Sequence, residues 1–176
     1  MPKQLLCTLF VSALVACQTV PHETLLLTQQ QVAMLEANGF QRVDDHWELG
    51  IPDRLLFDID DSSLDPRHVM RLQELSRALV AAGIHGARIE GHTDSTGAAA
   101  YNRQLSSRRA ETVRQTLIAA GMQAGAVTAT GLGESNPIES NRTATGRQEN
   151  RRVVIIVSPD DAASGPAGGE AAGTGR

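Results

Sequence analysis

The sequence predicts an α/β fold, a two-layer sandwich in which a mixed four-stranded sheet carries helices on one face. Two observations predict this fold. Short apolar segments with the period of strands are separated by longer segments with the 3.6-residue period of helices. Their order along the chain is strand, helix, strand, helix, strand, strand, which is typical of a sheet covered by a layer of helices.

The size and charge of the chain limit the kinds of protein to which it can belong. Its 176 residues, 41% of them hydrophobic, suffice for one medium domain with tails and a core that needs no disulfides or metal ions. The formal net charge is −4, and no basic block is present. Nucleic-acid binding is therefore not expected, because it requires a clustered Lys/Arg face.

The N-terminus has the features of an export signal. Lys3 precedes an apolar run over residues 5–15, which is too short for a membrane-spanning helix of roughly 20 residues. Residues 1–16 are therefore predicted to be a signal peptide. The run ends at Cys17 in a Leu-Val-Ala-Cys sequence, which resembles a bacterial lipobox.

The resemblance implies that the thiol of Cys17 receives a diacylglycerol; the alternative is ordinary secretion with an incidental Cys. Cys7 leaves with the signal peptide, so the mature chain would have no disulfide and no thiolate metal site. Gln18 after Cys17 resembles lipoproteins that are sorted to the outer membrane of Gram-negative bacteria. The expected location is the periplasmic face of the outer membrane.

The next segment is predicted to be a tether followed by two short elements. Residues 17–27 have no turn chemistry and no strong period, and ten extended residues reach on the order of 35 Å. Residues 28–31 have the form of a capping box, which predicts a short helix from about 29 to 38. Residues 40–43 and 46–49 then predict a hairpin.

This extension, residues 28–50, carries large apolar side chains on elements with little of their own to bury. Leu35, Phe40 and Trp47, the only Trp of the chain, are the main ones. Two interpretations stay open: the side chains fold back on the main domain as a satellite cluster, or they form a docking surface.

The main domain is predicted to span residues 51–158. Its elements are a strand over 55–57, a helix over 65–82, a strand over 87–92, a helix ending near 120, a strand over 127–133, a short helical turn over 143–149 and a strand over 153–157. The last strand is apolar on both faces and is expected at the centre of the sheet. Residues 159–176 are rich in Ala, Gly and Ser and are expected to be disordered.

One charge in the second long helix lies in the apolar stripe. Arg109 is four residues after Leu105 and four before Val113, which places it toward the core. A buried charge must be paired, because an isolated one costs several kcal/mol or more. Asp94, in the turn before this helix, is the carboxylate predicted to pair with it. Such a pair suits a small molecule that carries both signs of charge.

These residues also carry a family resemblance. The matching runs are Gly91-His92-Thr93-Asp94, Gly97, Tyr101-Asn102, Leu105-Ser106, Arg109-Ala110, Gly131-Leu132-Gly133-Glu134, Pro137-Ile138, Asn141 and Gly146 to Val153. From about residue 55 to 157 the chain resembles the OmpA-like peptidoglycan-binding domain. The resemblance implies that Asp94 and Arg109 hold the two ends of a diaminopimelate residue of the wall peptide.

The same resemblance extends the expected ligand site. It adds Thr93, Gly97 and Asn102 from the turn and helix, and the Phe57-Asp58 pair that borders the ligand groove of the family. The implied ligand is peptidoglycan, and no cofactor is implied.

The extension narrows the resemblance to a subfamily. Its Leu-Thr-x-x-Gln-Val-x-x-Leu-x-x-x-Gly-Phe pattern over 27–40 resembles the YfiB lipoproteins. The resemblance implies that this segment engages a periplasmic repressor, YfiR, and relieves inhibition of a diguanylate cyclase. Leu35, Phe40 and Trp47 match positions of the engaged segment. The alternative is a purely structural tie between outer membrane and wall, and whether the chain forms a homodimer stays open.

The short reach of the tether suggests one further hypothesis, that contact with the wall requires residues 28–50 to peel away from the domain.

An enzyme is the less favoured class. His92 and Asp94 point the same way from the strand, but no further ligand is at metal-site spacing, so no metal is predicted and His92 is expected to fix the turn. Ser106 has no base at a recognisable spacing, which argues against a wall hydrolase. Asn150 and Arg151 are expected to be structural.

Overall fold

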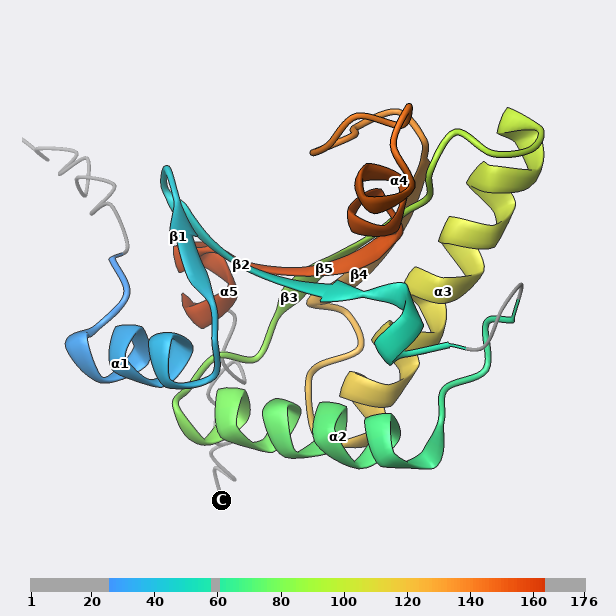
Figure 1. Cartoon of the computed structure of the whole chain (residues 1–176). Helices are drawn as coiled ribbons and strands as arrows, with labels where there is room; N and C mark the ends of the chain where they lie inside the picture. Colours follow the sequence, from blue (N-terminus) through green and yellow to red (C-terminus); the bar gives the residue numbers. More distant parts are fainter. Residues whose placement is uncertain (1–25, 58–60, 164–176) are drawn as a thin grey trace, which may run out of the picture.

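A twisted five-stranded sheet runs through the centre of the molecule (Figure 1). The computed structural model describes residues 26–57 and 61–163. The strand order is β1-β2-β5-β3-β4, with β3 and β4 parallel and the other neighbours antiparallel. The strands are β1 (Gln41–Val43), β2 (His46–Pro52), β3 (Ala87–His92), β4 (Val127–Gly133) and β5 (Arg152–Val157).

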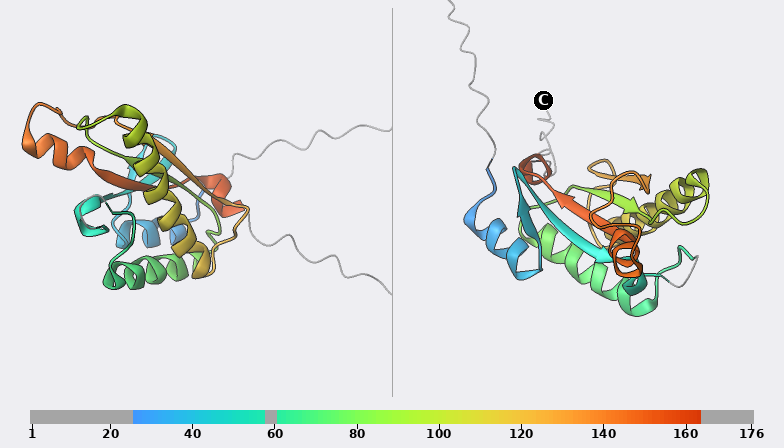
Figure 2. Two further views of the ribbon diagram at one scale, coloured as in Figure 1. Left: turned by 90° about the vertical axis from the view of Figure 1, so that its right-hand side faces the viewer. Right: turned by 45° about the horizontal axis from the view of Figure 1, so that its top comes forward.

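Two long helices form the second layer. Helix α3 (Ala99–Ala119) packs directly on β3 and β4, and α2 (Pro66–Ala81) packs against α3. The short α1 (Gln29–Ala37) contacts α2, while α4 (Ala144–Asn150) and α5 (Pro159–Ala163) lie at opposite ends of the sheet (Figures 1 and 2). The predicted α/β sandwich is confirmed.

Helix α3 lies unusually close to the sheet. A Cβ added at Gly91 would overlap the backbone carbonyl of Ser106, and one at Gly131 would overlap Ser107. Only glycine fits at these two points of contact, because backbone meets backbone there. The close packing places the first turns of α3 directly beside the end of β3.

The number of strands differs from the prediction. The segment predicted as a strand over 55–57 is instead a short 3-10 helix, Asp53–Leu55, followed by an isolated bridge at Phe57. Strand β2 takes its place: six of its residues, Trp47 to Pro52, pair with β5, and β1 adds a fifth strand at the edge. The chain leaves the sheet at Pro52, since Pro cannot donate to a strand ladder.

The extension is part of the core. Leu35, Phe40 and Trp47 are 0%, 3% and 8% exposed and belong to the same hydrophobic cluster as the interior of the main domain. The capping box predicted for α1 is present, with the Thr28 hydroxyl accepting from the Gln31 N–H at 3.2 Å. Of the two interpretations left open for these side chains, the structure shows the packed one.

The C-terminal boundary also differs from the prediction. The first residues of the predicted disordered tail form α5, in which the Asp161 carboxylate accepts from the Ser158 N–H at 2.7 Å. Residues 164–176, the predicted signal peptide and Cys17 lie outside the described residues. Within the described ranges, no helix is long and apolar enough to cross a membrane.

Candidate ligand-binding site

The turn after β3 holds a carboxylate at the end of the sheet. The Thr93 N–H donates to the Gly133 carbonyl at 2.9 Å, which ties the end of β3 to β4. The Asp94 carboxylate accepts from the Thr96 backbone N–H at 2.7 Å, so the side chain stabilises its own turn. Gly97 completes the turn with a φ of +92°, a conformation that favours glycine.

Asn102 in the first turn of α3 fastens this loop to the helix. Its buried Nδ2 donates to the backbone carbonyls of Asp94 at 3.2 Å and Thr96 at 3.1 Å. The same nitrogen donates to the Glu134 carboxylate at 2.8 Å. The amide of Asn102 therefore fixes the position of the Asp94 carboxylate relative to α3.

Arg109 lies two turns further along α3 and is 4% exposed, so its predicted burial is confirmed. Its Nη1 donates to the Asp53 carboxylate at 3.0 Å, and its Nε donates to the Asp61 carbonyl at 2.9 Å. The guanidinium also lies over the ring of Phe57, 5.1 Å from the ring centroid, within the range of a cation–π contact.

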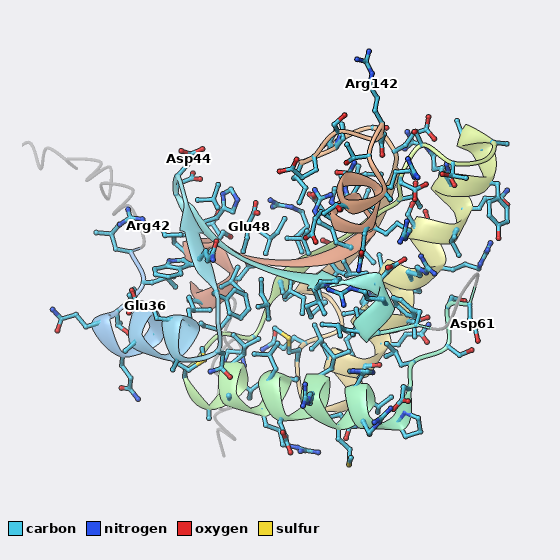
Figure 3. All side chains as sticks on the ribbon, in the orientation of Figure 1. Glu36, Arg42, Asp44, Glu48, Asp61 and Arg142 are labelled. Atoms are coloured by element: carbon cyan, nitrogen blue, oxygen red, sulfur yellow. The ribbon has the colours of Figure 1, made fainter. Side chains whose placement is uncertain are left out.

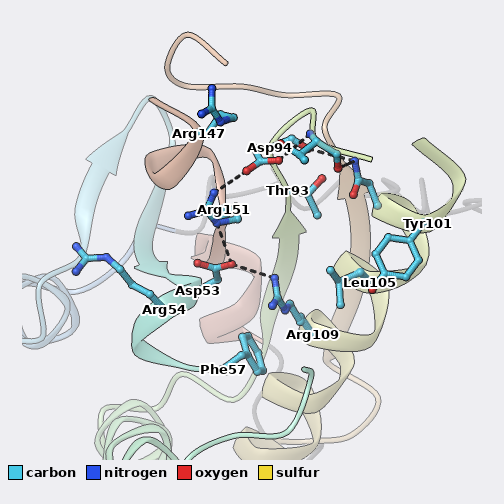
Figure 4. Close-up of a pocket in the computed structure, with 12 residues that line it drawn as sticks. Asp53, Arg54, Phe57, Thr93, Asp94, Tyr101, Leu105, Arg109, Arg147 and Arg151 are labelled. Carbon is cyan, nitrogen blue, oxygen red and sulfur yellow. Dashed lines mark hydrogen bonds and ion pairs between the residues drawn. The ribbon is translucent and has the colours of Figure 1, made fainter. Parts of the chain in front are cut away.

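The predicted Asp94–Arg109 pair is wrong, because each residue has a different partner. Asp94 accepts from Nη1 of Arg151 at 2.6 Å, and Nε of Arg151 lies 3.5 Å from the Asp53 carboxylate. The result is an alternating row of charges, Arg109, Asp53, Arg151 and Asp94, across the pocket (Figure 4). Each of the two carboxylates is thus satisfied by at least one guanidinium.

The two carboxylates have pKa values shifted in opposite directions. Burial raises the pKa of Asp53, and the neighbouring Arg109 and Arg151 offset this only in part. Burial also acts on Asp94, but hydrogen bonds from Thr96 and Arg151 outweigh it and lower the pKa of this carboxyl. Asp94 is therefore ionised at neutral pH and is the anionic end of the site.

A pocket of about 580 Å³ opens above this row of charges. Of the residues predicted for the ligand site, Phe57, Thr93, Asp94, Asn102 and Arg109 line it. Gly97 shapes the adjacent turn without lining the pocket, and Asp58 lies outside the described residues. Tyr101 and Leu105 add an apolar side, so the pocket combines fixed charges with an apolar surface.

Several residues that line the pocket were not among those predicted for the site, and Asp53 and Arg151 matter most because they complete the row of charges. Asp53 lies just before the segment predicted as a strand over 55–57, and no local pattern indicates that it pairs with an Arg 56 residues later. Arg151 was assigned a structural role, although it belongs to the Asn-Arg-Arg run that carried the family resemblance. That run was the available signal for it.

The residues considered for catalysis have other roles. The Ser106 hydroxyl donates to the Arg103 carbonyl at 3.0 Å and accepts from the Gly133 N–H at 2.9 Å, so it joins α3 to β4. His92 is buried, and neither ring nitrogen makes a hydrogen bond within the described residues, with the Glu90 carboxylate 3.7 Å away. His92 therefore does not fix the turn by hydrogen bonding, contrary to the expectation.

The environment of His92 also disfavours the charged form. Burial, together with the charge of Arg152, lowers the pKa of His92 to about 4. In ranges 26–57 and 61–163, no group of three or more His, Cys, Asp or Glu residues could hold a metal ion.

Comparison with known proteins places the chain in a family. Residues 56–151 match the model of the OmpA family. The chain belongs to the OmpA family. It is 44% identical over 147 residues to the outer-membrane lipoprotein YfiB of Pseudomonas aeruginosa, covering 84% of this chain and 87% of that protein.

A second relative and a solved structure agree with this family. The putative lipoprotein YfiB of Escherichia coli K12 is 38% identical over 132 residues, covering 74% of this chain and 82% of that one. The cell wall anchor of the T6SS from P. aeruginosa superposes with a TM-score of 0.63 at 28% identity, covering 77% of this chain and 99% of that chain. The chain is thus an OmpA-family lipoprotein of the YfiB subfamily. These relatives are anchors and lipoproteins, so it is grouped with non-enzymatic proteins.

Proposed function

We propose that this protein is an outer-membrane lipoprotein that binds peptidoglycan non-covalently through the diaminopimelate of the stem peptide. The observation that carries the proposal is the pocket, whose lining combines a fixed carboxylate and a fixed guanidinium with an apolar surface. The side chain of diaminopimelate ends in an ammonium and a carboxylate on one carbon. It is therefore complementary to such a site in both signs of charge.

The available hydrogen-bonding groups fit this ligand. Arg109 uses Nη1 and Nε for Asp53 and Asp61, and its Nη2 makes no hydrogen bond within the described residues. That edge can receive the ligand carboxylate. The Asp94 carboxylate accepts two hydrogen bonds, and an ionised carboxylate has about four lone-pair positions, so it can also accept from an ammonium.

The test is co-sedimentation with purified sacculi, using the soluble chain that begins at Gln18. Asp94→Asn and Arg109→Lys preserve the approximate shapes of the side chains while removing the anion and the planar fork. Each is expected to weaken binding by about 2 kcal/mol, or roughly thirtyfold. Asp94→Asn leaves the ligand ammonium unpaired in a partly desolvated pocket, and Arg109→Lys loses the planar set of hydrogen-bond donors to the ligand carboxylate.

A matched control removes a charge outside the pocket: Arg142→Gln changes an exposed side chain that points away from the molecule (Figure 3). Circular dichroism establishes that each variant is folded. Unchanged sedimentation of folded Asp94→Asn and Arg109→Lys would overturn the proposal.

A finer function is suggested by the extent of the match to YfiB. The match to YfiB covers 84% of this chain. Residues 56–176 make up a smaller share of the chain, so the match must also include part of the N-terminal extension. We propose that this extension captures a YfiR-like periplasmic repressor and thereby relieves inhibition of a diguanylate cyclase. A purely structural anchor between outer membrane and wall is the alternative.

The burial of Leu35, Phe40 and Trp47 changes how this finer function must be tested. Substitutions at these three positions would damage the core and could not separate partner binding from folding. Exposed residues of the same segment, such as Glu36, Arg42 and Val43, can be changed without loss of core packing. Val43 is 38% exposed at the edge strand β1.

The experiment is a titration with a purified YfiR-like protein. Under the capture hypothesis, Val43→Glu or Arg42→Glu lowers affinity for that protein and leaves sedimentation with sacculi unchanged. If neither the unaltered chain nor these variants bind the YfiR-like protein, the structural anchor is favoured.

A further inference from the structure

The pocket contains more positive than negative side chains. Four arginines and two carboxylates line it in the described part of the chain. Both carboxylates are already paired, Asp53 with Arg109 and Asp94 with Arg151. Arg54 and Arg147 have no carboxylate partner among the described residues, so two guanidinium groups of the pocket are not paired with a carboxylate.

These two arginines come from different elements on the same side of the pocket. Arg54 lies in the 3-10 helix Asp53–Leu55, and Arg147 lies in α4; both are labelled among the residues that line the pocket in Figure 4. Nη1 of Arg147 donates to the backbone carbonyl of Asn141 at 3.0 Å, which holds the side chain in place without neutralising it. Arg54 is exposed and Arg147 is half-buried.

We propose that Arg54 and Arg147 bind a second carboxylate of the ligand, beside the one held by Arg109. The ligand class is then a stem peptide with a second free carboxylate, besides the one at the end of the diaminopimelate side chain. The inference rests on the proposed peptidoglycan binding and adds a selectivity to it: stem peptides in which that carboxylate is amidated or consumed by a cross-link bind more weakly.

The dimensions of the pocket are consistent with a ligand larger than one side chain. Its volume of about 580 Å³ is within the range of sites that hold drug-sized molecules.

Two positions in the stem peptide supply this chemistry. One is the α-carboxylate of the γ-linked glutamate before diaminopimelate, and the other is the carboxylate at the C-terminus of the peptide. A guanidinium binds either one in the same bidentate way.

The test is isothermal titration of the soluble chain with defined muropeptides in low-salt buffer. The probes are the disaccharide tripeptide, the same compound amidated at glutamate, and the same compound amidated at its C-terminus. Selectivity for a second carboxylate predicts that one of the two amidated probes binds at least tenfold more weakly, and which one it is identifies the carboxylate.

Substitutions of Arg54 and Arg147 test whether these two residues cause the selectivity. Arg147→Gln is expected to lose about tenfold in affinity for the unmodified tripeptide, and Arg54→Gln roughly threefold, because exposed charges contribute less than half-buried ones. For the amidated probe that has lost the recognised carboxylate, both variants and the unaltered chain should bind alike. Arg142→Gln, the exposed control, should change nothing.

These experiments distinguish failure of the second-carboxylate site from failure of the proposed peptidoglycan binding. If both amidated probes bind like the parent, or if Arg54→Gln and Arg147→Gln bind the tripeptide normally while Asp94→Asn does not, the second-carboxylate site is refuted and peptidoglycan binding stands. If the unaltered chain binds no probe and no sacculi, the proposed function itself fails. Arg147→Lys, which retains the charge, should recover part of the affinity; a loss equal to that of Arg147→Gln would identify a structural defect instead and overturn the role of Arg147.

Discussion

Arg109 illustrates what the sequence can and cannot determine about a single side chain. Its position in the apolar stripe of a helix predicted that it is buried and paired, and the structure confirms both. Its partner could not be predicted, because helix periodicity says which way a side chain points and nothing about what lies opposite. The partner, Asp53, lies in a segment far from Arg109 in the sequence, directly after the Pro that ends strand β2. Asp94, the nearer carboxylate, is taken by Arg151.

His92 provides a prediction about pH. Its pKa is about 4 in the folded protein and about 6.5 when exposed, so the unfolded chain binds the extra proton between these values. The stabilising contribution of the neutral side chain is therefore present above pH 6.5 and is lost as the pH falls toward 4. Linkage gives a loss of about 3 kcal/mol at pH 4.

The measurement is urea unfolding of the unaltered chain and of His92→Phe at pH 7 and at pH 4. Other carboxylates titrate in both proteins, so the difference between the two isolates His92. The unaltered chain should lose about 3 kcal/mol more than the variant over this interval. Equal losses would show that His92 is not buried in its neutral form.

At the scale of elements, the sequence predicted most helices and strands but not all of their neighbours. The strands over 87–92, 127–133 and 153–157 and the helix after Asp65 are confirmed, because their period and end signals are local. The hairpin was predicted as an extension, whereas β2 pairs with β5 from about 100 residues later. A strand has the same alternation whether it is an appendage or a member of the sheet, so only the pairing partner distinguishes the two.

The contact between α3 and the sheet leads to a prediction about packing. Gly91→Ala is expected to destabilise the fold by about 3 kcal/mol, because the added methyl would overlap the Ser106 carbonyl and force α3 away from β3. Gly50→Ala in β2 is the matched control, since a Cβ there meets nothing within 4 Å. Chemical denaturation of both variants is the measurement. A similar cost for both would mean that the loss arises from strand glycines in general and not from the helix contact.

At the scale of the whole molecule, the extension and the main domain form one hydrophobic core. Release of residues 28–50 on contact with the wall would break the pairing of β2 with β5 and expose Leu35, Phe40 and Trp47. Exposing three such side chains costs roughly 2 kcal/mol each, a large part of the 5–15 kcal/mol that stabilises a typical domain. The peeling hypothesis is therefore not favoured by the structure.

Limited proteolysis checks this expectation. Cleavage within residues 28–50 should be equally slow with and without soluble wall fragments, while cleavage in the tether before residue 26 serves as the internal reference. Faster cleavage in the extension when wall fragments are present would revive the peeling hypothesis.

The central position of β5 has a consequence for how the protein reaches its folded state. This strand joins the two halves of the sheet, β2 on one side and β3 on the other, yet among the described strands it is the last to leave the ribosome. Until it emerges, the earlier strands lack their common neighbour, and Asp94 and Asp53 lack Arg151, which directly precedes β5. The described sheet therefore cannot be completed until residues 152–157 have emerged, so its folding is delayed until nearly all of the described domain has been synthesised.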